Sequence, residues 1–130
     1  METWAKKEAL FKVPKKKVKH TIEGQGDIYI YSLTCGEKDE YESDAYKVMA
    51  GSREVRTEMA RALLIQRTVH DQHGNLLFTE TDIGKIAAMD SWLTEPIYLK
   101  ARNVSRMTVA DMEELVKNSG KIQSDDSGTE

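Results

Sequence analysis

The chain has few of the residues that stabilise secreted or membrane-spanning proteins. Its 130 residues include a single cysteine, Cys35, which excludes an internal disulfide and fits a reducing compartment. Apolar runs fall far short of the roughly 20 residues needed to cross a bilayer. The first residues include the charged Glu2, Lys6 and Lys7 in place of an apolar signal-peptide segment. We therefore expect no membrane span, a cytoplasmic protein, and a buried or half-buried Cys35 with no role as a nucleophile.

Charge is unevenly distributed along the chain. Residues 1–20 carry seven lysines and two glutamates, whereas the remaining 110 residues carry twelve basic and twenty acidic side chains. A basic segment thus precedes an acidic body. Such an electrostatic dipole favours head-to-tail contacts between copies of one chain.

Residues 1–16 are expected to form a basic N-terminal arm, because Pro14 interrupts helix formation there. The run Pro14–Lys19 is similar to a nuclear-import signal or a nucleic-acid contact, which leaves open an alternative function as a small DNA- or RNA-binding regulator. We favour a solvated segment leading into a strand, because no aromatic residues alternate with the lysines and the acidic body would repel phosphates.

Two short segments with alternating polarity follow the arm. Val18–Ile22 and Ile28–Leu33 flank the glycine-bearing loop Glu23–Gly26, a pattern that predicts a β-hairpin. A lone hairpin has marginal stability, so it is expected to pack on helices.

The rest of the chain shows helix caps, each followed by an apolar stripe. The expected helices begin near Thr34, Ser52, Thr79, Asp90 and Thr108. Pro96 would be tolerable only in the first turn of its helix. The predicted fold class is mainly α: a small helical domain of about five helices over residues 17–118, with a short N-terminal β-hairpin and a disordered acidic tail over residues 119–130.

The segment Val69–Asp82 lies between the two longest helical patterns and is expected to organise the core. Leu77 and Phe78 should close a helix–turn–helix unit there. His70, Asp71 and His73 offer two imidazoles and a carboxylate, but their spacing is not that of helical zinc motifs. We interpret the segment as a turn in which the Asp71 side chain accepts backbone hydrogen bonds and Gly74 or Asn75 has a positive φ. We find no enzyme signature and expect no metal or cofactor.

Surface chemistry favours protein association instead. Five tyrosines, two tryptophans and six methionines exceed what one small helical core needs, and aromatic residues and methionine are enriched in interfaces.

The chain also resembles the tail assembly chaperones of long-tailed (siphophage, lambda-like) bacteriophages, over roughly residues 15–107. The resemblance lies in an Asp–Gly turn, an apolar–Phe pair and a second Asp that opens a helix, here Asp71, Gly74, Leu76–Thr79 and Asp82–Ile83. A helical segment reaching Asn103 and the earlier segments Lys15–Lys19, Asp27–Ile30 and Glu37–Tyr41 fit the same layout. The Arg-rich helix Arg53–Arg67 and the turn histidines depart from it.

The resemblance implies a non-catalytic chaperone in the host cell cytoplasm, absent from the mature virion. It implies that the protein binds the tape measure protein before the tail tube polymerises, and that it forms homo-oligomers. It also implies a longer product made by a −1 ribosomal frameshift, sharing residues 1 to about Lys121, which contacts the tail tube protein. Ser119–Lys121 can be encoded by the slippery heptamer used in that family.

Two sets of contact residues follow from this interpretation. An apolar groove between helices is expected to receive tape measure helices, with contacts from Met59, Leu63, Phe78, Trp92 and Ile97. The basic arm of one copy is expected to meet the acidic body of another through Lys15, Lys16 and Lys17. Neither nucleic acid nor membrane is an expected partner.

Overall fold

A computed structural model describes residues 4–50 and 57–107. The described elements are α1 (Lys7–Phe11), β1 (Lys17–Ile22), β2 (Gly26–Tyr31), α2 (Cys35–Ala50), α3 (Thr57–Thr68), β3 (Val69–His70), the 3₁₀ helix η1 (Glu80–Asp82), α4 (Ile83–Ala87) and α5 (Ser91–Val104). The described residues do not include the predicted first residues of two helices, Ser52 and Thr108, nor the predicted tail or the frameshift boundary. Among the described helices, none has both the length and the apolar character to cross a membrane.

The expected hairpin is confirmed. β1 and β2 pair antiparallel with Lys17 opposite Tyr31 and Ile22 opposite Gly26. Gly24 and Gly26 have φ values of 81° and 122°, a backbone region that glycine adopts without steric cost. Ile28 and Ile30 of β2 are buried, so this strand presents its alternating apolar residues to the helices.

A third strand makes the predicted mainly-α class wrong. β3 pairs antiparallel with β2, placing Val69 opposite Ile30 and His70 opposite Tyr29. The fold is therefore mixed α/β, with five α-helices and a three-stranded sheet in the order β1-β2-β3 among the described residues. The sequence predicts no strand at Val69, because this residue continues the apolar pattern of the helix before it. In the structure the chain passes directly from α3 into β3, where Val69 and Ile30 bury each other completely.

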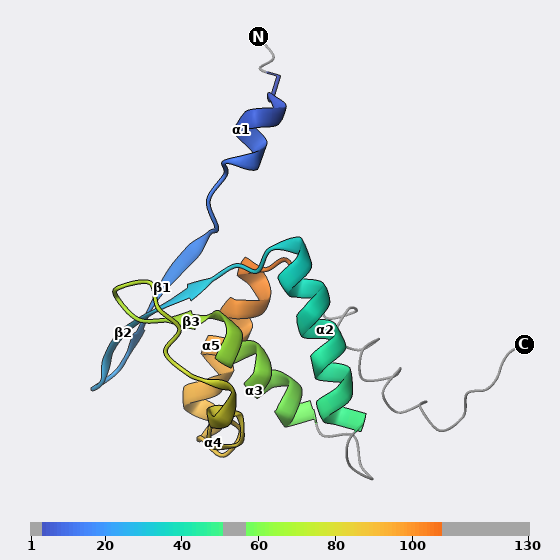
Figure 1. Ribbon diagram of the computed structural model, residues 1–130. Coiled ribbons are helices and arrows are strands. Elements are labelled where there is room, and N and C mark those ends of the chain that lie inside the picture. The colour runs from blue at the N-terminus through green and yellow to red at the C-terminus, as the bar shows by residue number, and fades with distance from the viewer. Residues whose placement is uncertain (1–3, 51–56, 108–130) are drawn as a thin grey trace, which may run out of the picture.

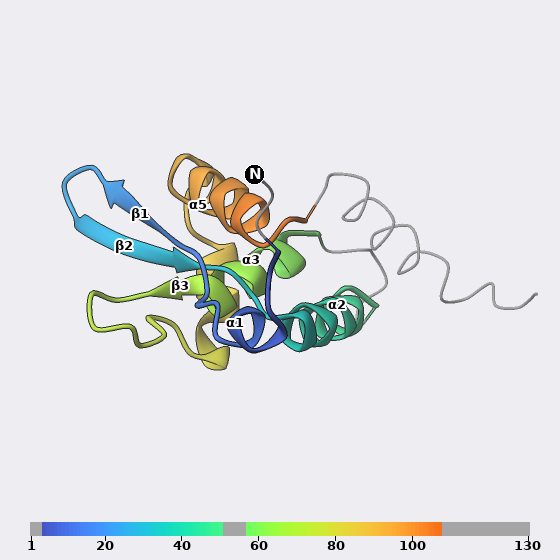
Figure 2. The same cartoon turned by 90° about the horizontal axis from the view of Figure 1, so that it is seen from above.

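α3 is the central element of the core. It contacts α2, α4, α5 and β2, and in two views it lies between α2 and α5 (Figures 1 and 2). Helices that are surrounded in this way have buried residues on most of their circumference. The buried residues of α3 are Ala60, Ala62, Leu63, Leu64, Ile65, Gln66 and Thr68.

Local caps place the helices as the sequence predicts. The Thr34 N–H donates to Glu37 Oε1 (2.9 Å) and the Glu37 N–H donates to Thr34 Oγ1 (3.1 Å), forming a capping box at the start of α2. Thr79 and Asp82 form another before α4. Asp90 Oδ1 accepts from the Trp92 N–H (3.1 Å) at the start of α5.

Three local expectations are wrong. Leu77 is 46% exposed, and only Phe78 of the expected pair packs against the core. Cys35 is exposed because it is the first residue of α2. Pro96 lies beyond the first turn of α5, where its ring leaves the carbonyl of exposed Trp92 without the usual helical donor. The arm contains the short helix α1, which ends at Phe11, before Pro14, where the sequence predicts that a helix cannot continue.

Candidate functional site

The five predicted partner-binding residues do not form one surface. Leu63 and Ile97 are 2% and 3% exposed and belong to the hydrophobic core, so a partner cannot reach them in this fold. Met59 is half-buried in α3. Phe78 is half-buried beside α3, whereas Trp92 is 62% exposed at the start of α5. The apolar stripe that predicted a groove is thus mostly the inner face of the helices.

The three lysines predicted to contact another copy have partners within their own chain. Lys15 Nζ lies 2.6 Å from Glu37 Oε1. The Lys16 N–H donates to Ser32 Oγ (3.0 Å). The Lys17 ammonium lies over the rings of Tyr29 and Tyr31, 5.4 and 5.9 Å from their centroids. These contacts fix the base of the arm against the body.

One hollow among the described residues is an open groove with an acidic rim, which we call the acidic groove. Its volume is about 470 Å³. Its lining residues are Leu33, Glu37, Glu40, Asp44, Gln66, Arg67, Leu76, Phe78, Thr79 and Glu80. Three carboxylates share one side of α2, because positions 37, 40 and 44 follow helical spacing. Apolar surface comes from half-buried Leu33 and Phe78 and from Leu76, which is 51% exposed.

Two buried polar atoms at this groove lack partners among the described residues. Gln66 is 4% exposed; its Nε2 donates to the Phe78 carbonyl (3.1 Å), and its Oε1 is unpaired. Arg67 Nη2 pairs with Asp44 Oδ2 (2.5 Å), and its Nη1 is unpaired. Buried polar atoms are normally satisfied, so each of these unpaired atoms carries an uncompensated desolvation cost within the described structure.

Electrostatics keep the groove rim negative. The hydrogen bond from Lys15 and, to a lesser extent, that from the Thr34 N–H lower the pKa of Glu37, outweighing the opposing effect of its partial burial. The carboxylate is therefore ionised at neutral pH. The recurrence of acidic residues at helical spacing along α2 is the sequence signal for one wall of this groove.

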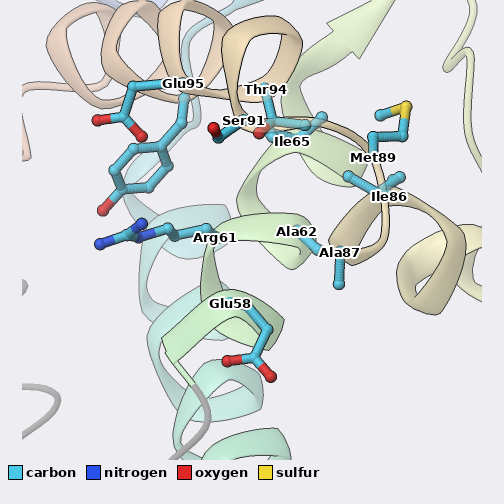
Figure 3. A pocket seen from close by; sticks show the side chains of 11 residues that line it. Glu58, Arg61, Ala62, Ile65, Ile86, Ala87, Met89, Ser91, Thr94 and Glu95 are labelled. Carbon is cyan, nitrogen blue, oxygen red and sulfur yellow. The ribbon is translucent and has the colours of Figure 1, made fainter.

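A smaller hollow of about 150 Å³, which we call the socket, opens between α3, α4 and the start of α5. Its residues are Glu58, Arg61, Ala62, Ile65, Ile86, Ala87, Met89, Ser91, Thr94, Glu95 and Tyr98. Figure 3 shows apolar Ile86 and Met89 at one end and charged Glu58, Arg61 and Glu95 toward the other. Arg61 also lies over the Tyr98 ring, 5.5 Å from its centroid. A cavity of roughly this size accommodates a benzene-sized group.

The histidine-bearing turn has a structural explanation. Asp71 Oδ1 accepts from the N–H groups of His73 (2.8 Å) and Asn75 (3.0 Å), and Gly74 has a φ of 84°. The predicted turn geometry is confirmed. The hydrogen bond from Asn75 is the largest of the effects that lower the pKa of Asp71.

The histidines have other partners. His70 Nδ1 is 2.8 Å from the Thr68 carbonyl oxygen, and its ring stacks on Tyr31 with centroids 4.1 Å apart. His20 Nδ1 is 2.8 Å from Lys100 Nζ. Within residues 4–50 and 57–107, no three His, Cys, Asp or Glu side chains form a group that could hold a metal ion.

No family model, curated protein or solved structure matches this chain. A functional proposal therefore depends on the two hollows, the exposed apolar residues around them, and the motif resemblance over residues 71–83.

Proposed function

We propose that this protein is a non-catalytic, self-associating binding protein for helical segments of another protein. The observation that carries this proposal is an exposed apolar stripe of α5, the helix whose Ser91, Thr94 and Tyr98 line another side of the socket. Trp92 is 62% exposed and Leu99 is 37% exposed, and their spacing places them on one side of the helix with Pro96. Large exposed aromatic residues next to a pocket are typical anchors of protein interfaces.

Within this class, we propose the particular role of a bacteriophage tail assembly chaperone that binds the tape measure protein. The motif from Asp71 to Ile83 supports this role through its resemblance to that family. A tape measure protein is a long, largely helical chain that exposes apolar side chains before the tube encloses it. Many weakly binding copies along such a chain bind with high avidity and limit aggregation. The chaperone acts in the host cytoplasm and is absent from the finished particle.

Co-purification with the phage's own tape measure protein tests the proposal. Trp92→Ser removes the exposed anchor, and Ala87→Phe fills the socket from the end of α4. Both changes should reduce the recovered tape measure protein at least tenfold while the fold is retained. Val18→Ser is a matched control, because Val18 is also exposed (36%) but lies on β1, outside both the motif and the α5 stripe. A wild-type protein that fails to bind any tape measure segment would overturn the assignment.

A longer frameshift product is part of the same proposal. Slippage at the codons for Ser119–Lys121 would yield a minor protein that shares the described domain and adds a segment for contact with the tail tube protein. Reading those nucleotides tests the idea directly, and codons that cannot slip would remove it.

Nucleic-acid binding through the lysine arm is the competing function. It predicts that the protein shifts nucleic acid in a gel, with an affinity that falls steeply as the salt concentration rises. The structure brings the base of the arm next to acidic Glu37, an arrangement that disfavours phosphate at this point.

A further inference from the structure

The N-terminal arm exposes nearly all of its apolar surface. Trp4, Leu10, Phe11 and Val13 are 83%, 59%, 81% and 67% exposed. α1 has no buried residue, and Figure 1 shows it projecting away from the helices. Four large apolar side chains on one exposed segment, interspersed with lysines, are characteristic of a segment that binds elsewhere.

The chain holds this arm outward. The Lys16 N–H donates to Ser32 Oγ, and the Ser32 N–H donates back to the Lys16 carbonyl (2.8 Å). The Lys15–Glu37 ion pair adds a third contact immediately after Pro14. These contacts extend the β1–β2 pairing by one more residue and hold the chain just after Pro14, and α1 projects away from the body beyond that point (Figure 1). The arm is better placed to reach a neighbour.

The acidic groove complements the arm in charge, polarity and size. Its rim carries Glu40, Asp44 and Glu80, while the arm carries Lys6, Lys7 and Lys12. At about 470 Å³ the groove is about three times the volume of a cavity that takes one benzene-sized group. Leu76 and Phe78 supply an apolar surface for side chains such as those of Leu10 and Phe11.

We propose that the acidic groove of one copy binds the N-terminal arm of a second copy. Arm lysines pair with Glu40 and Glu80, and Phe11 packs on Leu76 and Phe78. The contact rests on the self-association proposed above and identifies the two surfaces that make it.

This contact joins two different surfaces of the same chain. Each copy donates one arm and offers one groove, so the interface is heterologous, and it produces an open chain or a closed ring of copies. An isologous dimer is not required by this arrangement.

Charge reversal in the full-length protein tests the contact. We compare Lys7→Glu/Lys12→Glu in the arm with Glu40→Lys/Glu80→Lys in the groove; all four side chains are exposed, so both variants should fold. Lys47→Glu/Lys85→Glu, again at exposed positions, reproduces the net-charge change of the arm variant and is its control. Molar mass is measured by light scattering at low salt, and circular dichroism verifies folding.

Each reversal should weaken the apparent association constant by about tenfold, because two exposed ion pairs are lost. The control should associate as the wild type does. Mixing the arm variant with the groove variant should restore association, since the acidic arm then meets a basic groove and the basic arm meets an acidic groove. The single substitution Phe11→Ser in the otherwise wild-type chain should weaken association even at high salt, where ion pairs are screened.

The outcomes separate this contact from the proposed function. Oligomers that survive both reversals, or a mixture that fails to recover, would overturn the arm–groove contact while leaving tape measure binding intact. A monomeric wild type that binds the tape measure protein would overturn the contact and self-association but retain the chaperone role. Oligomers that follow the charge pattern but ignore the tape measure protein would support the contact and overturn that role.

Discussion

Replacing Asp44 with asparagine should loosen the attachment of α2 to α3. Asp44 Oδ2 lies 2.5 Å from Arg67 Nη2, and the two side chains are 32% and 19% exposed. Arg67 Nη1 has no partner among the described residues, so Asp44 is the counter-charge that the structure shows for a largely buried guanidinium. Asparagine keeps an oxygen that can accept the hydrogen bond and removes only the charge.

The burial of the pair sets the expected magnitude. Solvent-exposed ion pairs contribute about 0.2–1 kcal/mol, whereas breaking a fully buried pair costs about 3–5 kcal/mol. Asp44 and Arg67 lie between these limits but closer to the surface case. We therefore expect Asp44→Asn to lower the free energy of unfolding by about 1–2 kcal/mol.

Urea denaturation followed by circular dichroism measures this change. For a slope of about 2 kcal/mol/M, the midpoint should fall by ~0.5–1 M. Asp27→Asn is the matched control, because the Asp27–Lys19 pair is longer (3.4 Å) and its side chains are 42% and 58% exposed. The control should shift the midpoint by less than about 0.3 M.

Removing both charges tests the reasoning further. In Asp44→Leu/Arg67→Met no unpaired charge remains, so this double variant should be more stable than Asp44→Asn. A double-mutant cycle with the single variants Asp44→Leu and Arg67→Met isolates the interaction energy between the two side chains. The stabilising role of the Asp44–Arg67 ion pair is refuted if Asp44→Asn is no more destabilising than Asp27→Asn.

Four further changes have separable expected outcomes. Leu64→Ala leaves a cavity at a fully buried site and should lower the free energy of unfolding, measured in urea, by about 2–5 kcal/mol. Tyr41→Phe removes only the hydrogen bond to the Ala60 carbonyl (2.9 Å) and should lower it by about 1 kcal/mol. Equal losses of stability in the two variants would contradict this ranking. Trp92→Ala should change the free energy of unfolding by less than about 0.5 kcal/mol while reducing tape measure binding, and a large loss of stability would show that Trp92 is a core residue. Burial and, secondarily, Lys100 lower the pKa of His20 in the folded state, so the unfolded chain takes up this proton at a higher pH than the folded chain does. The contribution of His20 to stability should be fully present above about pH 6.5 and should be lost as the pH falls below it. Urea titrations at several pH values measure this dependence, which His20→Gln should flatten.

The parts of the fold that short-range chemistry determines were predictable from the sequence. The box formed by Thr34 and Glu37, the cap at Asp90 and the glycine-bearing hairpin each depend on residues within a few positions of one another. β3 was not predictable in this way. Two residues cannot display alternation, and Val69 continues the apolar pattern of the preceding helix.

The hollows could not be predicted from local pattern, because each joins segments that are distant in sequence. The acidic groove combines α2 with the end of α3 and with the loop after β3, and only tertiary packing brings Glu40 near Glu80. Periodicity identified apolar residues correctly but could not distinguish buried Leu63 and Ile97 from exposed Trp92. The same limit explains why Leu77 was assigned to the core.

The junction between Thr68 and Val69 has no connecting residue, so helix and strand share a boundary. One inserted residue there would rotate the preceding helix by about 100° relative to the sheet or exchange the sides on which Val69 and His70 lie. Neither change preserves the packing of both elements. We expect length variation among descendants of this chain to avoid the junction and to collect in the nearby Asp71–Asn75 turn, whose residues are mostly exposed.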